Sequence, residues 1–189
     1  MRISALLFTA VFLVAACDPE PDEPAPDVDD PVDEPVGVTM PDWFDLDEDA
    51  ETVTIDLVAG ETSANNYWNF NGLLAGDAIV RVPLDYEVTV NLSNEDPNMG
   101  HSAGIGELQD SYPSTFSAAE AEPLFEGAVT PNPTSMTEST QPGEEDSFTF
   151  TADEAGEFAM ICYVDGHAQQ NMWLEFHVTE DMDQVGVEM

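Results

Sequence analysis

A cysteine, a histidine and a methionine follow one another at equal intervals near the end of the chain. Cys162, His167 and Met172 are each separated by four residues, which gives a Cys-x4-His-x4-Met motif. Thiolate, imidazole and thioether are soft or borderline ligands, and this set suits copper better than calcium or magnesium. A blue-copper site needs one Cys, two His and a weak axial Met. The motif therefore predicts a copper site whose second histidine comes from elsewhere in the chain.

The chain has only three histidines, which narrows the choice of that ligand. His177 alternates with the apolar residues Leu174 and Phe176, so we expect its side chain to point away from the core. His101 follows a separate predicted strand, from which it can meet the cysteine loop at one end of a sandwich. By elimination, His101 is the expected fourth ligand. The next residue, Ser102, is a candidate for linking the two ligand segments.

Two alternatives to a copper site stay open at this point. Zinc also binds cysteine and histidine, although a thioether in the fourth position favours copper. The other alternative is coincidence: a buried free cysteine, a turn histidine and a core methionine that happen to share this spacing. Tyr67, Trp68 and Trp43 are likewise either core residues or part of an electron path.

Five segments of alternating apolar and polar residues predict the strands that must hold these ligands. They are residues 52–58, 78–82, 86–92, 146–151 and 173–178. Turn signals lie between them, for example Asn71-Gly72 and Pro142-Gly143. This pattern favours an antiparallel β-sandwich or barrel. Residues 110–141 break the pattern, and within them residues 117–122 predict a short helix capped by Ser117.

The cysteine loop, the histidine segment and the strand pattern together resemble a cupredoxin, and more narrowly the sulfocyanin family. The segments that carry the resemblance are residues 69–72, 82–84, 88–94, 123–128, 166–168 and 171–173. The resemblance covers about residues 52–178. It implies an all-β, Greek-key sandwich with one long, partly helical loop insertion. We place this sandwich domain at residues 40–180.

The resemblance also implies one type 1 copper per chain. His101, Cys162 and His167 match the equatorial ligands of the family, and Met172 matches the axial one. The chain departs from the family close to these ligands. The family usually has Gly and Pro where this chain has Tyr163 and Asp165, and Gly where it has Asn171.

What the resemblance implies about function is single-electron transfer, with copper cycling between Cu(II) and Cu(I), and no enzymatic activity. The expected partners are redox proteins of a respiratory chain: a cytochrome c, a quinol-oxidising complex or a terminal oxidase. A copper-binding chaperone or storage lipoprotein is the alternative. Such proteins usually hold Cu(I) in Met- and His-rich or paired-Cys sites, and the sequence has no second thiol near Cys162.

The first 39 residues predict a signal peptide and a tether. Residues 5–14 are a short apolar run, and Val14-Ala15-Ala16-Cys17 follows it directly. Small residues before a cysteine at this place resemble the lipobox of a bacterial lipoprotein, which implies removal of residues 1–16 and lipid attachment to Cys17. Residues 17–39 are rich in Asp, Glu and Pro, and predict an extended spacer. The domain is then expected on the extracytoplasmic, periplasmic side of a bacterial membrane, and residues 181–189 are expected to form a C-terminal tail.

The charge of the chain is strongly one-sided. It has 40 Asp and Glu against two arginines, Arg2 and Arg81, for a net charge of −38 at pH 7. This balance excludes electrostatic binding to nucleic acid or to anionic lipid headgroups. Two interpretations fit it: adaptation to high salt, where the Debye length is about 3 Å at 1 M, or steering of a cationic partner. Nothing in the sequence indicates an obligate oligomer, and we expect a monomer.

Overall fold

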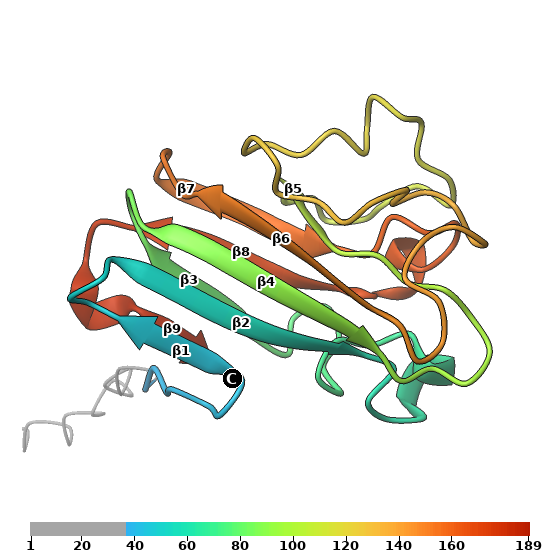
Figure 1. Cartoon of the computed structure of the whole chain (residues 1–189), viewed down its shortest axis with the longest axis horizontal. Helices are drawn as coiled ribbons and strands as arrows, with labels where there is room; N and C mark the ends of the chain where they lie inside the picture. Colours follow the sequence, from blue (N-terminus) through green and yellow to red (C-terminus); the bar gives the residue numbers. More distant parts are fainter. Residues whose placement is uncertain (1–36) are drawn as a thin grey trace, which may run out of the picture. The chain divides into compact units, whose positions relative to one another are not determined.

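A computed structural model describes residues 37–189, which form two β-sheets packed face to face (Figure 1). The first sheet has the strand order β1-β2-β4-β6. Its strands are β1 (Phe44–Asp47), β2 (Thr52–Ala59), β4 (Glu87–Asn94) and β6 (Glu145–Thr151). The second sheet has the order β5-β7-β8-β3-β9. Its strands are β5 (Gly104–Glu107), β7 (Gly156–Ile161), β8 (Trp173–Thr179), β3 (Ile79–Pro83) and β9 (Gly186–Glu188).

The predicted all-β sandwich is confirmed, and each of the predicted strands forms within a residue or two of its expected limits. The pairing differs from the expected antiparallel one at two places. β2 runs parallel to β4, and β3 runs parallel to β8. The reason is that the chain changes sheet between β2 and β3 and again between β3 and β4. A parallel pair needs such a crossover connection, because a tight hairpin joins only antiparallel strands.

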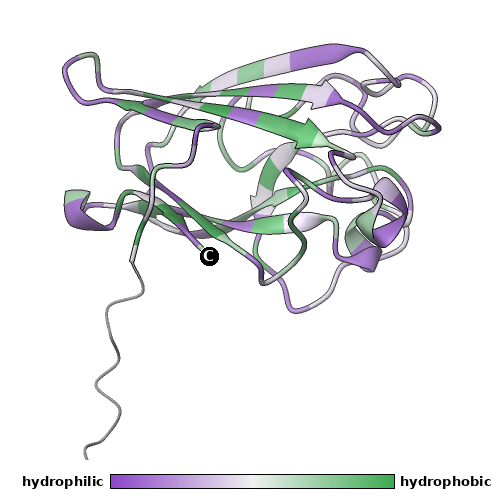
Figure 2. Ribbon diagram, turned by 90° about the horizontal axis from the view of Figure 1, so that it is seen from below, coloured by the Kyte–Doolittle hydropathy of each residue, from purple (hydrophilic) through white to green (hydrophobic). Residues whose placement is uncertain are grey.

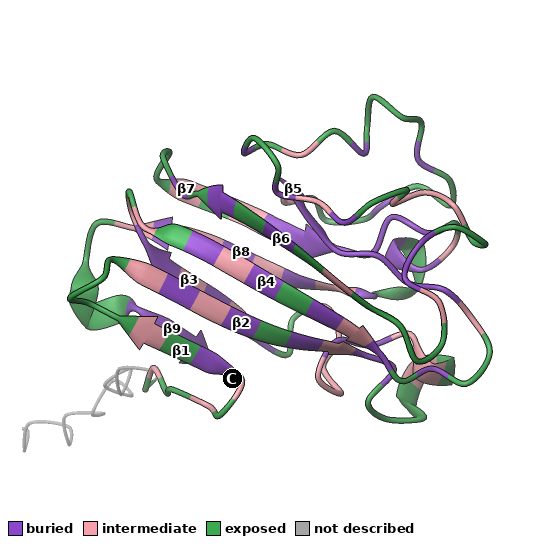
Figure 3. Ribbon diagram, viewed as in Figure 1, coloured by how far each residue is buried: buried purple, intermediate pink, exposed green. Residues whose placement is uncertain are grey.

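Alternating side chains build the core between the two sheets, where the apolar positions of both sheets face each other (Figure 2). Along β2 and β4, buried residues alternate with more exposed ones (Figure 3). The buried positions of these two strands are Val53, Ile55, Leu57, Val88, Val90 and Leu92. This period of two is what the sequence pattern predicts for strands with one face in a core.

The long connection from β5 to β6, residues 108–144, packs part of its length on the outer face of β7. Tyr112, Phe116 and Ala121 form a second apolar cluster there with Ile161 and Tyr163. The short helix expected at residues 117–122 does not form. Only a turn is present, in which the Ser117 N–H donates to Glu120 Oε2 at 2.7 Å and the Glu120 N–H donates to Ser117 Oγ at 3.3 Å. Pro123 follows so closely that the segment is too short to sustain a helix.

The C-terminal residues belong to the domain, which corrects the expected tail at 181–189. β9 pairs antiparallel with β3, and Val187 is fully buried. The backbone N–H of Thr39 donates to the carbonyl oxygen of Val187 at 2.8 Å. The apolar residues Val185 and Val187 enter the main core, and their burial draws this segment onto the edge of the sheet.

Residues 1–36 lie outside the described part of the chain. The predicted signal peptide at 1–16, the lipid attachment at Cys17 and most of the predicted tether at 17–39 therefore stay predictions. Among the described residues, no helix has the length and apolar character that crossing a membrane requires.

Candidate metal centre

The four predicted ligands come from two loops that meet at one end of the sandwich, on the right in Figure 1. His101 lies in the loop between β4 and β5. Cys162 directly follows β7, and Met172 directly precedes β8. His167 precedes a single 3-10 turn, Ala168–Gln170, which folds the loop between these two strands. Two backbone hydrogen bonds close this loop, from Cys162 N–H to Met172 O at 3.2 Å and from Met172 N–H to His167 O at 3.0 Å.

Three of these side chains meet in the interior of the protein. His101, Cys162 and His167 are all fully buried. The Nδ1 atoms of the two histidines are 3.1 Å apart. Cys162 Sγ is 3.4 Å from His167 Nδ1 and 3.9 Å from His101 Nδ1. Both imidazoles therefore turn the same ring nitrogen towards the thiol.

This geometry fits a transition-metal ion. Metal–nitrogen and metal–sulfur bonds to such ions are about 2.0–2.3 Å long, so ligand atoms around one ion lie between 3 and 4 Å apart. A triad of two imidazole nitrogens and one thiolate is the equatorial set of a blue-copper site. Carboxylate ligands, which calcium and magnesium require, are not part of this cluster.

Met172 lies next to this triad in the chain fold. Its side chain is fully buried and belongs to the same apolar cluster as Cys162. The turn that leads to it ends at Asn171, whose φ of 69° and ψ of 21° are left-handed. Glycine and asparagine are the residues that adopt this conformation most readily. Asn171 is therefore suited to a position at which the resemblance to sulfocyanins leads us to expect glycine.

Ser102 links the two ligand segments, as the sequence suggested. Its hydroxyl oxygen accepts a hydrogen bond from the Tyr163 N–H at 2.9 Å and lies 3.8 Å from Cys162 Sγ. Burial raises the pKa of the Cys162 thiol to about 11, although hydrogen bonds from Ser102 and Val164 oppose this shift. A bound metal ion removes the thiol proton outright. The buried thiol is therefore inert without metal and a ligand with it.

The outer nitrogen of His101 is held by a carboxylate. Nε2 of His101 lies 2.9 Å from Asp96 Oδ2, and both side chains are buried. This contact leaves Nδ1 of His101 free to face the thiol. Burial lowers the pKa of His101, while the hydrogen bond and the charge of Asp96 act in the opposite direction. The imidazole is therefore neutral near pH 7, as a metal ligand must be.

The outer nitrogen of His167 has a different environment. The indole of Trp68 stacks on the imidazole, with ring centroids 4.2 Å apart and planes 24° from parallel. His167 Nε2 is buried and has no hydrogen-bond partner among the described residues. Burial, together with the charge of His101, lowers the pKa of His167 to about 3. Trp68 thus keeps water away from this side of the site.

An unusual turn places Trp68. Three consecutive residues before it, Asn65, Asn66 and Tyr67, have positive φ angles. The Asn65 side chain donates from Nδ2 to the carbonyl oxygen of Trp68 at 2.9 Å and to that of Gln170 at 2.6 Å. The second contact joins the turn to the ligand loop. The stacking of Trp68 on His167 is therefore built into the local backbone.

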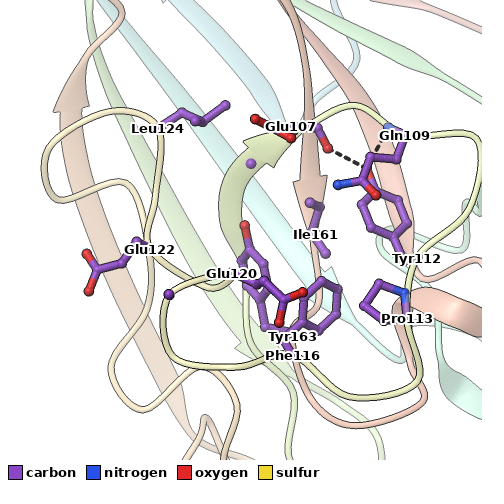
Figure 4. A pocket seen from close by; sticks show the side chains of 12 residues that line it. Glu107, Gln109, Tyr112, Pro113, Phe116, Glu120, Glu122, Leu124, Ile161 and Tyr163 are labelled. Carbon is purple, nitrogen blue, oxygen red and sulfur yellow. Dashed lines mark hydrogen bonds between the residues drawn. The ribbon is translucent and has the colours of Figure 1, made fainter.

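Tyr163 occupies the position after the cysteine, where the resemblance to sulfocyanins leads us to expect glycine. Its ring is buried among the residues of the second cluster, and its hydroxyl has no hydrogen-bond partner there. A Cβ atom on Gly106 would lie 2.3 Å from this hydroxyl oxygen, so Gly106 makes room for the larger side chain. A pocket of about 290 Å³ borders the same ring, between Tyr163, Phe116 and Glu120 (Figure 4). It lies on the side of β7 opposite the main core and is separate from the triad.

His177 is not part of the site. It lies on the opposite face of β8 from Leu174 and Phe176, as expected, and its Nε2 is 3.1 Å from Glu175 Oε2. Asp96 is the functional candidate that the sequence analysis missed. In a chain with 40 acidic residues, no local signal distinguishes this one from its neighbours.

Comparison with known proteins gives one family. The model of the sulfocyanin (SoxE) domain matches residues 42–185, about three quarters of the chain. No curated protein sequence matches the chain.

Several solved structures have a similar chain trace at low sequence identity. Reduced rusticyanin is 20% identical, with a TM-score of 0.49 over 73% of this chain and 86% of that one. Auracyanin A, a "blue" copper protein from Chloroflexus aurantiacus, is 18% identical, with a TM-score of 0.46 over 68% and 99% of the two chains. Reduced auracyanin from Roseiflexus castenholzii is 17% identical, with a TM-score of 0.45 over 67% and 96%.

Proposed function

We propose a specific role for this chain, which belongs to the sulfocyanin family: a membrane-tethered blue-copper protein that carries single electrons between partners of a respiratory chain. Sulfocyanins are cupredoxins, which bind one type 1 copper and transfer electrons rather than catalyse a reaction. The observation that carries the proposal is the buried His101–Cys162–His167 triad, whose three ligand atoms lie 3.1–3.9 Å apart.

Each residue of the site has a role in this proposal. His101 and His167 supply neutral Nδ1 ligands, Cys162 supplies the thiolate, and Met172 supplies the weak axial thioether. Bound copper supplies the chemistry of the site, a one-electron change between Cu(II) and Cu(I). Cys162 and Met172 sit at strand ends, and the segments that carry Cys162 and His101 are held by hydrogen bonds to Ser102 Oγ and Asp96 Oδ2. A site that is held in this way needs little rearrangement when its charge changes.

Electrons are proposed to enter and leave through His167 and Trp68. The imidazole of His167 is the ligand in direct contact with the indole, and Trp68 is itself partly exposed to solvent. A partner that contacts Trp68 is then separated from the site by two stacked rings. His101, in contrast, has its outer nitrogen turned to a buried carboxylate.

The membrane tether and the partners are supported by sequence alone. Cys17 follows the short apolar run and the small residues typical of a lipoprotein signal, and residues 17–39 have the composition of an extended spacer. We place the domain on the periplasmic side of a bacterial membrane. The strongly acidic chain fits either a basic partner such as a cytochrome c or life in high salt.

A redox titration of the copper-loaded full chain tests the carrier role. One electron per chain should be taken up and returned reversibly, with copper retained through repeated cycles in the presence of a Cu(I) chelator. The Cys162→Ser variant should not hold copper through reversible one-electron cycles, and His177→Ala should behave like the unaltered chain. Loss of copper to the chelator on reduction would instead favour a chaperone or storage protein.

A further inference from the structure

One of the two histidines at the candidate site lies next to a negatively charged side chain, Asp96, and the other does not. The Asp96 side chain is 98% buried, yet it lies in hydrogen-bond contact with the ligand His101. Its other oxygen, Oδ1, accepts backbone N–H bonds from Asn98 at 2.8 Å and Met99 at 3.3 Å. A metal ion on Nδ1 of His101 leaves the proton on Nε2, which then donates to Oδ2, so that Asp96 accepts hydrogen bonds on both oxygens as a carboxylate does.

Asp96 is itself fixed from behind. Its backbone N–H donates to Asn94 Oδ1 at 2.9 Å. Asn94 Nδ2 in turn donates to the carbonyl oxygens of Met99 and Thr140, each at 2.8 Å. Thr140 also accepts the backbone N–H of His101 at 3.0 Å. This network binds the loop of residues 94–101 at both ends, so the carboxylate and the imidazole have little freedom to separate.

No basic side chain neutralises this carboxylate. Arg81 is the only Lys or Arg among residues 37–189, and its guanidinium pairs with Glu188 on β9. A buried charge without a partner is costly. The positive charge nearest to Asp96 is therefore the one that a metal ion brings to the triad, one imidazole away.

We infer that Asp96 positions His101 for the metal and lowers the reduction potential of the site. This inference rests on the proposed blue-copper function. With Cys162 as thiolate, the site carries one net positive charge when oxidised and none when reduced. Asp96 changes these totals to zero and minus one. The carboxylate therefore stabilises the oxidised state, which accepts one electron from a redox partner, relative to the reduced state that this transfer forms.

The Asp96→Asn variant separates charge from shape, because an asparagine keeps an acceptor oxygen for His101 Nε2. At the effective dielectric constant of about 20 typical of proteins, we expect the variant to favour the reduced state at least about tenfold more than the unaltered chain does. Tenfold corresponds to about 59 mV for one electron, so the potential should rise by that amount or more. Asp56→Asn, which removes an exposed carboxylate that accepts from Asn91, is the matched control and should leave the potential unchanged.

The experiment is a potentiometric titration of the copper-loaded full chain and of both variants, followed by visible absorption. A rise in potential for Asp96→Asn alone, with the absorption spectrum retained, supports the inference. Equal potentials for Asp96→Asn, Asp56→Asn and the unaltered chain would overturn it.

A second measurement needs neither a variant nor copper. Nitrogen NMR of the metal-free chain reports which ring nitrogen of His101 carries the proton. A proton on Nε2 supports the positioning role of Asp96, and a proton on Nδ1 overturns it. Because this measurement uses the unaltered chain, it decides the question even if Asp96→Asn fails to fold. If the unaltered chain shows no blue-copper spectrum at all, the proposed function fails, and the NMR result still decides whether Asp96 orients His101.

Discussion

Trp68 and His167 lie with their rings stacked, 4.2 Å between centroids, so that a proposed metal ligand is covered by an aromatic side chain that is itself partly exposed. This contact distinguishes the two histidines. His101 has its outer nitrogen on Asp96, and His167 has its outer nitrogen buried without a hydrogen-bond partner among the described residues. The hydrogen bond to Asp96 fixes the orientation of His101. His167 instead contacts the partly exposed ring of Trp68, which lies between it and the solvent.

Replacing Trp68 should change how His167 titrates. In the metal-free protein, the pKa of His167 is lowered to about 3, and burial is the main cause. Trp68→Leu admits water to Nε2, so we expect the pKa to rise towards the ordinary value of about 6.5. An NMR titration of the imidazole measures this shift. Trp43→Leu is the control, and an unchanged pKa of His167 in Trp68→Leu would show that the indole does not shield it.

Tyr163 and Gly106 should behave as a coupled pair. Gly106→Ala places a methyl group against the Tyr163 hydroxyl, and overpacking of this kind typically costs about 1–3 kcal/mol of unfolding free energy. Tyr163→Phe removes a buried hydroxyl without a partner and should be neutral or stabilising. The double variant should recover part of the loss, because Ile161 Cδ1 still lies 2.9 Å from the added methyl group. Denaturant unfolding of the metal-free variants measures each value, and a double variant no more stable than Gly106→Ala would contradict the contact.

The stability of the metal-free protein should fall as the pH drops below about 6.5. The pKa values of His101 and His167 are both lowered in the folded state, chiefly by burial. The unfolded chain therefore binds more protons than the folded chain in this range, and protonation favours unfolding. Each histidine contributes up to about 1.4 kcal/mol per pH unit. Unfolding at pH 7, 6 and 5 tests this slope, which His167→Gln should reduce. Equal stability at pH 7 and pH 5 would rule out buried neutral histidines.

Salt should separate the two interpretations of the acidic surface. A net charge of −38 repels itself at low ionic strength, and the Debye length falls from about 10 Å at 0.1 M to about 3 Å at 1 M. We expect the melting temperature to rise over this range if the chain is adapted to high salt. If the charge serves to steer a basic partner, the rate of electron exchange with a basic cytochrome c should fall steeply over the same range. A melting temperature that falls with salt would contradict adaptation.

The clustering of His101, Cys162 and His167 and the strands with regular alternation could be predicted from sequence, because both follow from spacing. The Cys-x4-His-x4-Met motif lies in one loop, and the scarcity of histidines left His101 as the second imidazole. β1, β5, β7 and β9 lie outside the five predicted segments. Of these, β5 and β9 are short and contain Gly104, Gly106 and Gly186, which interrupt any alternating pattern.

Asp96 and Trp68 could not be assigned in the same way, because their roles depend on contacts across the fold. Asp96 is one acid among many in the sequence, and only its burial against His101 sets it apart. Trp68 reaches His167 through three consecutive left-handed residues; asparagine adopts this conformation readily, but a run of three that ends in Tyr67 does not follow from propensity.

The most direct test of the account is the visible and EPR spectrum of the full chain loaded with Cu(II) in high salt. A type 1 site predicts an intense thiolate-to-copper charge-transfer band and a narrow copper hyperfine splitting. Both features should disappear in Cys162→Ser, while His177→Ala should retain them. A weak or colourless complex, or one that the chain forms only with Cu(I), would contradict a blue-copper electron carrier.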